Sequence, residues 1–275
     1  MTQISGRPAP APVPPQALPY DLATTVTGSG PGILLAHGAG GGVAANFAPL
    51  VPALAAEHTV IGGDYPGSGD TPRSPEPLDL DALADSLAGA AVRAGAGTFT
   101  VLGYSLGTAV AARLAARHPE RVRGLVLTAG LARADRRLRL SMGVWRDLLG
   151  RGDTAAYARF NALTAFGADH LDSLTEEELA ALLPEIADTV PPGAPEQAAL
   201  VQTADTTADL AGITVPTLVV ATTQDTLVSP AHSRRVAELV PGAEYAELAT
   251  GHLPMVEDPA GWQSLITDFL RRHGL

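Results

Sequence analysis

The sequence predicts an α/β fold built on a mostly parallel sheet that helices cover on both faces. Two observations lead to this prediction. From Ile33 onward, short apolar runs bounded by Gly, Pro or Asp alternate with longer segments rich in Ala, Leu and Arg. Such runs are typical of parallel strands buried on both faces, and strands that alternate with helices imply right-handed crossover connections. A long stretch without a convincing strand then breaks the alternation, which indicates an insertion.

Each expected element rests on its own run of residues. The expected strands are the apolar runs at 33–36, 59–61, 98–102, 125–127 and 217–220, and a further apolar run lies at 245–248. The segments between these runs have helical composition and span several turns. The expected helices are 46–57, 80–94, 105–117, 232–239 and 261–272.

The stretch that breaks the alternation covers about 85 residues, which is too long for a structureless loop in a compact domain. Helices are expected there instead, at 136–149, 154–165, 175–189 and 196–207. Thr175 is the expected N-cap of the third helix. Four of the twelve aromatic residues of the chain lie in this stretch, and they either form its own small core or line a substrate pocket. They are Trp145, Tyr157, Phe160 and Phe166.

Composition excludes several classes of function. The chain has 275 residues, 46% of them hydrophobic, so it can bury a core as one large domain or two small ones. Its net charge of −11 argues against nucleic-acid binding. No apolar run approaches the roughly 18 residues that a membrane span needs. Residues 1–20 are proline-rich and lack the apolar run of a secretory signal, so they are expected to form an extended tail and the protein is expected in the cytoplasm.

The basic residues and cysteines narrow the chemistry further. All 18 basic residues are arginine, and the chain has no cysteine. Schiff-base chemistry, a P-loop lysine, disulfides, zinc–thiolate sites and a thiol nucleophile are therefore excluded. Ser, His, Asp, Glu and Arg remain.

The sharpest local motif is the G-x-S-x-G at 103–107, which follows an expected strand and opens an expected helix. A serine on such a tight turn has a strained backbone, and the flanking glycines allow chain segments to approach closely. The N-terminal N–H groups of the following helix favour developing negative charge at Ser105.

A second motif, the glycine-rich turn at 36–42, follows the first expected strand. Its backbone N–H groups could hold a phosphate or an acyl oxyanion. A dinucleotide site is disfavoured because Val43 stands where the third glycine of G-x-G-x-x-G would be, and Asp64 lies too far along the chain.

Two further polar residues, Asp225 and His252, each follow an apolar run. A serine hydroxyl is a poor nucleophile until an imidazole accepts its proton, and the imidazole needs a carboxylate to orient it. Ligands of open α/β sheets bind beyond the carboxyl ends of the strands, where Ser105, Asp225 and His252 are all expected.

These residues together resemble the α/β-hydrolase fold superfamily over about residues 21–275. The resemblance rests on the early His37-Gly38 turn, the chain order Ser105, Asp225, His252, and a D-x-x-G-x-G turn at 64–69. It implies core segments at 21–129 and 211–275 and a helical cap, or lid, at 130–210. Gln224 departs from the family pattern, in which glycine often precedes the acid, and this could tilt the carboxylate.

The resemblance also implies a role for each site residue. Ser105 would be the nucleophile, His252 the general base and then acid, and Asp225 the orienting carboxylate. The oxyanion hole would be the backbone N–H groups of Ala39 and Leu106, and no metal or organic cofactor would be required. Tyr104, together with the four cap aromatics, is a candidate for binding the substrate.

Three functional hypotheses follow. The first is a serine hydrolase of an ester, thioester or lactone whose substrate is a small apolar acyl compound. The second uses the same triad for carbon–carbon bond hydrolysis, perhydrolysis, or acyl transfer or cyclisation in natural-product tailoring. The arginine-only, Ala/Gly/Pro-rich composition is associated with actinobacteria, where such enzymes are frequent. The third is a non-catalytic receptor for a small molecule.

A basic cluster precedes and enters the first expected cap helix. It is either a solvated face or a surface that steers an acidic or carrier-bound substrate. Its members are Arg133, Arg136, Arg137 and Arg139.

Overall fold

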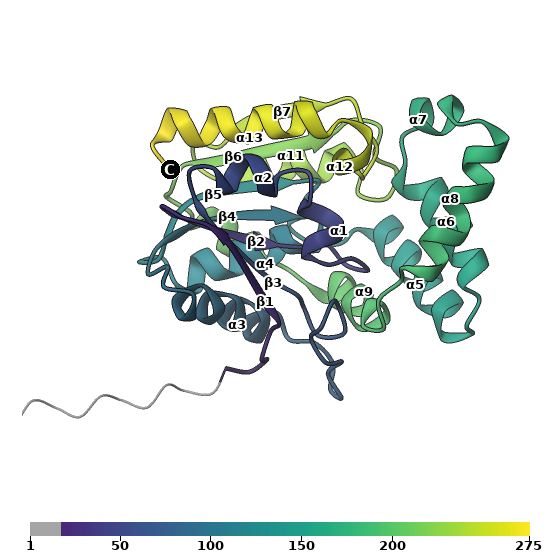
Figure 1. Ribbon diagram of the computed structural model, residues 1–275, viewed down its shortest axis with the longest axis horizontal. Coiled ribbons are helices and arrows are strands. Elements are labelled where there is room, and N and C mark those ends of the chain that lie inside the picture. The colour runs from purple at the N-terminus through teal and green to yellow at the C-terminus, as the bar shows by residue number, and fades with distance from the viewer. Residues whose placement is uncertain (1–17) are drawn as a thin grey trace, which may run out of the picture.

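The computed structural model describes residues 18–275, and it has a seven-stranded sheet with helices on both sides (Figure 1). The first strand pairs antiparallel with its neighbour, and all other neighbours are parallel. The predicted mostly parallel, doubly covered sheet is confirmed. In spatial order the strands are β1 (Thr24–Gly28), β3 (Thr59–Gly63), β2 (Gly32–Ala36), β4 (Phe99–Tyr104), β5 (Val122–Thr128), β6 (Thr217–Thr222) and β7 (Glu244–Leu248).

The two faces of the sheet form two apolar cores because successive side chains of a strand point to opposite faces. In β2, Ile33 and Leu35 belong to one core and Leu34 to the other. The first core is covered by α1 (Val43–Phe47), α2 (Val51–Ala55) and α13 (Pro259–His273); the second is covered by α3 (Leu80–Arg93), α4 (Leu106–Arg117) and α11 (Pro230–Leu239). Figure 1 shows α13 and α3 on opposite sides of the sheet.

The stretch between β5 and β6 contains only helices, and α5 to α8 gather beyond one end of the strands (Figure 1). Asp135 and Asp153 accept hydrogen bonds from the first turns of α5 and α6, and Thr175 forms a capping box with Glu178 at the start of α8. Local capping residues therefore set where α5, α6 and α8 begin. The helices of the stretch are α5 (Arg136–Gly150), α6 (Thr154–Ala165), α7 (Ala168–Ser173), α8 (Glu176–Asp188), α9 (Ala194–Thr203) and α10 (Thr207–Ala211).

Two predicted helices are wrong as single elements. The helix expected at 46–57 is two short helices, α1 and α2, because Pro49 and Pro52 lie in it and proline supplies no N–H donor to a helix interior. The helix expected at 196–207 ends at Thr203, and α10 begins separately at Thr207.

The sequence also missed four short elements, namely β1, α7, α10 and α12 (Pro254–Glu257). The proline-rich tail expected at 1–20 lies, up to residue 17, outside the described residues. Within residues 18–275, no helix combines the length and the apolar character that crossing a bilayer requires.

Candidate active site

Ser105 lies on the tight turn between β4 and α4. Its backbone φ is 53° and its ψ is −120°, a conformation that residues with a side chain rarely adopt. The N–H of Ser105 donates to the carbonyl oxygen of Thr128 in β5, at 3.0 Å, and the N–H of Thr108 donates to the carbonyl oxygen of Ser105, also at 3.0 Å. The turn is therefore held in its strained shape by bonds to the sheet on one side and to the helix on the other.

The two glycines of the motif allow the close approach that the sequence predicts. A Cβ at Gly107 would overlap the carbonyl oxygen of Ala36 at the end of β2. A Cβ at Gly103 would lie 2.5 Å from the carbonyl oxygen of Gly107. Neither glycine has a positive φ, so each is required for space and not for its conformational freedom.

Ser105, Asp225 and His252 come together from beyond the ends of three strands of the sheet, β4, β6 and β7. The hydroxyl oxygen Oγ of Ser105 lies 2.9 Å from Nε2 of His252. The other ring nitrogen, Nδ1, lies 2.6 Å from Oδ2 of Asp225. All three residues are buried. This arrangement allows the imidazole to donate Nδ1–H to the carboxylate while Nε2 accepts the hydroxyl proton.

The carboxylate of Asp225 is fixed by its own loop. Its Oδ1 accepts hydrogen bonds from the backbone N–H groups of Leu227 and Val228, at 2.9 and 2.8 Å. Its Oδ2 also accepts a bond from the hydroxyl of Thr222, at 3.0 Å. Because these donors surround the carboxylate, its orientation toward His252 does not depend on His252 alone.

Two backbone N–H groups beside Ser105 remain available for a ligand. Ala39 follows β2 and lines the cavity above Ser105, and Leu106 is the first residue of α4. In the part of the chain that the structure describes, neither N–H group has a hydrogen-bond acceptor. The N–H of Leu106 is one of the groups that a helix leaves unpaired at its N-terminus. Both groups can therefore donate to a developing oxyanion.

The turn that carries Ala39 is held by two side chains that the sequence analysis missed. The N–H of Gly38 donates to Oδ1 of Asn46, and the N–H of Gly40 donates to Oε1 of Gln197, both at 2.9 Å. Gln197 is fully buried in α9, and its Nε2 donates to the hydroxyl of Ser68 at 2.9 Å. With the flanking N–H groups occupied, the turn presents the N–H of Ala39.

The surroundings of His37 indicate a structural role. It is fully buried, and its ring stacks on that of Tyr65 with 3.8 Å between the centroids. The N–H of Tyr65 donates to its Nε2 at 2.8 Å, so the proton of the neutral ring is on Nδ1, which lies 2.8 Å from the carbonyl oxygen of Gly38. Burial lowers the pKa of His37 to about 4, although the Gly38 bond and the charge of Asp64 act in the opposite direction. His37 therefore stays neutral at physiological pH.

A cavity of about 510 Å³ lies between Ser105 and the inserted helices. Three of the four predicted cap aromatics line it, namely Trp145, Tyr157 and Phe166. Phe160 does not line it and packs instead, partly buried, against the core. The other apolar residues of its wall include Leu138, Met142, Leu182, Ile186, Val190 and Met255.

Tyr104 lines the same cavity and also supports the site. Its hydroxyl donates to the carbonyl oxygen of His252 at 2.8 Å, and its ring centroid lies 5.2 Å from that of His252. Burial raises the pKa of Tyr104 well above its usual value, so the phenol keeps its proton and remains a donor.

The inserted helices contact the histidine loop directly. The N–H of His252 donates to the carbonyl oxygen of Ala165 at the end of α6. The carboxylate of Glu257 accepts from the N–H of Gly251, at 2.8 Å, and from the N–H of Gly167, at 3.3 Å. Glu257 thus bridges the histidine loop and the segment between α6 and α7.

The loop that carries Asp225 is bonded to the same segment. Gln224 donates from Nε2 to Oδ2 of Asp169 at 2.6 Å, and the hydroxyl of Thr226 donates to the carbonyl oxygen of Thr164 at 3.0 Å. The residue that departs from the family pattern, Gln224, therefore connects the acid loop to α7. Asp225 keeps its 2.6 Å contact with His252 in spite of that departure.

Within residues 18–275, no three His, Asp or Glu side chains are grouped so that they could hold a metal ion. In this structure a serine, a histidine and an aspartate in contact lie beside an apolar cavity, beyond the carboxyl ends of the strands of a doubly covered sheet. This arrangement is typical of hydrolases. The chain belongs to the α/β-hydrolase family, because the model of the alpha/beta hydrolase fold matches residues 31–259.

Individual relatives agree with this assignment. The chain is 34% identical over 247 residues to pyrrolizixenacetamide deacetylase of Xenorhabdus hominickii, covering 89% of this chain and 92% of the relative. It is 31% identical over 233 residues to a pimeloyl-acyl-carrier-protein methyl ester esterase of Neisseria meningitidis, covering 82% and 88%. Among solved structures, it is similar to the enol-lactonase of Burkholderia xenovorans, with a TM-score of 0.79, 26% identity and coverage of 91% and 96%.

Proposed function

We propose that this protein is a serine-dependent hydrolase that cleaves an ester, thioester or lactone through an acyl-enzyme on Ser105. The observation that carries the proposal is the continuous series of contacts from Oγ of Ser105 to Nε2 of His252, at 2.9 Å, and from Nδ1 of His252 to Asp225, at 2.6 Å. An imidazole so placed can accept the serine proton as the oxygen attacks.

In the acylation step, Oγ of Ser105 forms a bond to the acyl carbon while its proton passes to Nε2 of His252. The carbonyl oxygen becomes an oxyanion that accepts hydrogen bonds from the N–H groups of Ala39 and Leu106. Such donors typically lower the barrier by about 3–4 kcal/mol each. When the tetrahedral intermediate collapses, the bond to the leaving group breaks and His252 donates the proton to it. Asp225 stabilises the imidazolium that exists between these two transfers.

In the deacylation step, a water molecule takes the place of the leaving group. His252 accepts a proton from the water as its oxygen attacks the acyl carbon, and returns it to Oγ of Ser105 as the acid departs. Because one imidazole serves both directions, no metal or organic cofactor takes part in the proposed reaction.

The substrate is proposed to be an apolar acyl compound. The cavity above Ser105 is walled by apolar and aromatic side chains, among them Trp145, Tyr157 and Phe166. Half of the residues that line the cavity come from the stretch between β5 and β6. We therefore assign residues 130–210 as a cap that selects the acyl group and residues 21–129 and 211–275 as the core that reacts with it. The names of two of the relatives, an esterase and an enol-lactonase, support ester-type bonds.

A fluorophosphonate probe tests the mechanism. We expect the wild type to gain one label on Ser105, as read by intact mass and peptide mapping, and Ser105→Ala to gain none. Ser264→Ala, in α13, is the matched control and should label like the wild type. A folded wild type that stays unlabelled would favour the non-catalytic receptor.

A substrate panel separates the remaining reactions of the same triad. We expect aryl esters, acyl thioesters and lactones to be cleaved. We expect no cleavage of vinylogous diketones and no perhydrolysis when hydrogen peroxide is supplied with a carboxylate. Activity on the diketones alone would replace the esterase proposal with carbon–carbon hydrolysis.

The cytoplasmic location stays a prediction, which fractionation of the native cells would test.

A further inference from the structure

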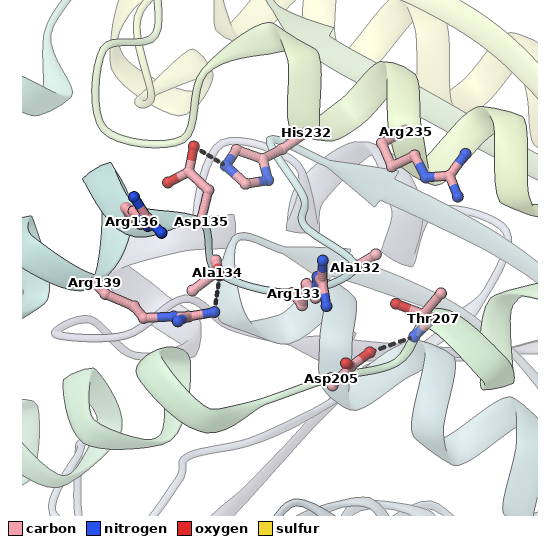
Figure 2. A pocket seen from close by; sticks show the side chains of 10 residues that line it. All are labelled: Ala132, Arg133, Ala134, Asp135, Arg136, Arg139, Asp205, Thr207, His232 and Arg235. Carbon is pink, nitrogen blue, oxygen red and sulfur yellow. Dashed lines mark hydrogen bonds and ion pairs between the residues drawn. The ribbon is translucent and has the colours of Figure 1, made fainter.

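A second cavity, of about 640 Å³, lies where the inserted helices join the core (Figure 2). It is formed by the segment that leads into α5, by the segment between α9 and α10, and by α11. It shares no lining residue with the cavity above Ser105, although the first turn of α5 contributes Leu138 to that cavity and Arg139 to this one. The second cavity is therefore a separate site that the proposed hydrolysis does not use.

The charged residues of the second cavity are unusual for this chain. Four arginines line it, Arg133, Arg136 and Arg139 from one segment and Arg235 from α11. The acidic residues that line it are two aspartates, which leaves a formal excess of two positive charges in a protein whose net charge is −11. A local charge of this sign in an acidic protein attracts anions specifically to that place.

The two aspartates are occupied by neighbouring groups. Oδ1 of Asp135 accepts from the N–H of Leu138 as the N-cap of α5, and its Oδ2 lies 3.4 Å from Nε2 of His232. Oδ1 of Asp205 accepts from the N–H of Thr207 at 3.0 Å. Figure 2 shows the carboxylate of Asp135 turned to His232 and that of Asp205 turned to Thr207. Within residues 18–275, neither aspartate forms an ion pair with an arginine of this cavity, although the hydrogen bonds from Thr207 and the charge of Arg133 lower the pKa of Asp205.

The guanidinium groups of the four arginines keep N–H donors available for a ligand. Among residues 18–275, Arg133 and Arg136 form no ion pair. One nitrogen of Arg139 donates to the carbonyl oxygen of Ala134 at 2.8 Å, which holds its guanidinium beside that carbonyl (Figure 2). Arg235 pairs with Glu238 on its own helix, at 3.0 Å, in an exposed ion pair, and such pairs contribute little.

We propose that this second cavity binds a phosphate-bearing small molecule other than the substrate. Guanidinium groups present planar forks of donors that match phosphate oxygens bidentately. A phosphomonoester carries about 1.5 to 2 negative charges at neutral pH, which matches the excess of two positive charges. The volume is within the usual range of small-molecule sites and exceeds the needs of a bare phosphate, so an organic group accompanies it.

Calorimetric titration of the full-length protein with pyrophosphate and with phenyl phosphate, at constant ionic strength, tests the proposal. We expect saturable binding of one molecule per chain. Arg133→Gln combined with Arg139→Gln should weaken it by about tenfold or more, because each lost donor is a charge-assisted one. Arg235→Gln alone, on the exposed face of α11, should weaken it severalfold and supplies a second variant that does not disturb α5.

The matched control is Arg137→Gln. Arg137 lies in the same turn of α5, and its loss removes one positive charge, as Arg235→Gln does, but it does not line the cavity. The affinity of Arg137→Gln for both probes should stay within about twofold of that of the wild type, since Arg137 offers no direct contact. Absence of saturable binding to the wild type, or equal weakening by Arg137→Gln and the cavity variants, would overturn the proposal.

Kinetics test whether the second cavity is separate from the cavity above Ser105. Saturating pyrophosphate should leave the KM for a neutral aryl ester unchanged, because the two cavities share no residue. Competition between pyrophosphate and the ester would show that the cavities are one site and would contradict the inference. Binding is measured independently of turnover, so it can be repeated on Ser105→Ala.

Discussion

The backbone N–H of His252 donates a hydrogen bond to the carbonyl oxygen of Ala165, with 2.5 Å between the nitrogen and the oxygen. Ala165 is the last residue of α6, so an inserted helix bonds directly to the residue that would move the proton. The approach is possible only because the preceding residue, Gly251, has no side chain. A Cβ there would overlap the N–H of Gly167 and lie 2.5 Å from the carbonyl oxygen of Ala165.

Gly251→Ala should therefore lower kcat strongly and the stability of the fold only slightly. The added methyl forces the histidine loop away from α6, and a displacement of about 1 Å at a catalytic group can cost on the order of 100-fold in rate. Ester hydrolysis and circular dichroism of the folded variant measure the two effects. Gly150→Ala is the control, because no atom lies within 4 Å of a Cβ built there. If Gly251→Ala hydrolyses esters within twofold of the wild type, the contact does not position His252.

The strained backbone of Ser105 predicts that glycine at this position gives a more stable protein than alanine. At a φ of 53° and a ψ of −120°, a residue with a Cβ is strained, and glycine is not. Ser105→Gly should raise the free energy of unfolding by about 1 kcal/mol relative to Ser105→Ala, since both remove the hydroxyl and only the first removes the strain. Urea titration of both variants provides the comparison. Equal stabilities would mean that the turn is relaxed.

The aromatic residues of the inserted helices predict two different phenotypes. Trp145 lines the cavity above Ser105 and Phe160 does not. Trp145→Phe should change the kcat/KM ratio between short and long acyl esters by about tenfold, as expected when a pocket wall changes shape. Phe160→Leu should lower only the thermal midpoint. A changed ester preference in Phe160→Leu, with none in Trp145→Phe, would reassign the wall of the pocket.

His37 predicts how stability depends on pH. Its pKa is about 4 in the folded protein against an ordinary value of 6.5, so between these values the unfolded chain binds more protons than the folded one. The free energy of unfolding should therefore fall as the pH is lowered from about 6.5 to 4, by up to roughly 3 kcal/mol. Glu244, whose pKa the Arg272 and His273 contacts lower to about 2, adds to the loss only below about pH 4.5.

Urea unfolding at half-unit steps between pH 7 and 4.5 measures this dependence. The variant His37→Asn should show a flatter profile across that window, because asparagine does not titrate. A wild-type profile without slope above pH 4.5 would show that His37 protonates without cost in the folded state.

The residues of the site divide into those that the sequence reveals and those that it hides. Ser105, Asp225 and His252 could be predicted because each stands in a short pattern beyond a strand. Gln197 could not, because it lies 157 residues from Gly40 in the chain and nothing around it marks an amide that holds a distant turn. Such partners depend on how α9 packs, which no local pattern records.

The elements of the fold divide in a similar way. Strands in the middle of the sheet, such as β4, are buried throughout and were predicted from their apolar runs. The edge strand β1 is exposed along its whole length and has no apolar run to reveal it. Its pairing with β3 depends on backbone hydrogen bonds, which any sequence can supply.

The contact between Gly107 and Ala36 makes the serine turn and the glycine-rich turn one unit, since the helix that opens with Leu106 rests on the strand that ends at Ala36. We therefore expect that protein engineering can change the acyl preference without changing the serine turn. Grafting residues 130–210 of a relative onto this core should transfer the relative's acyl preference without rebuilding the serine turn. The graft must keep two features, a carbonyl oxygen where Ala165 offers its own to His252 and an amide where Gln197 holds Gly40.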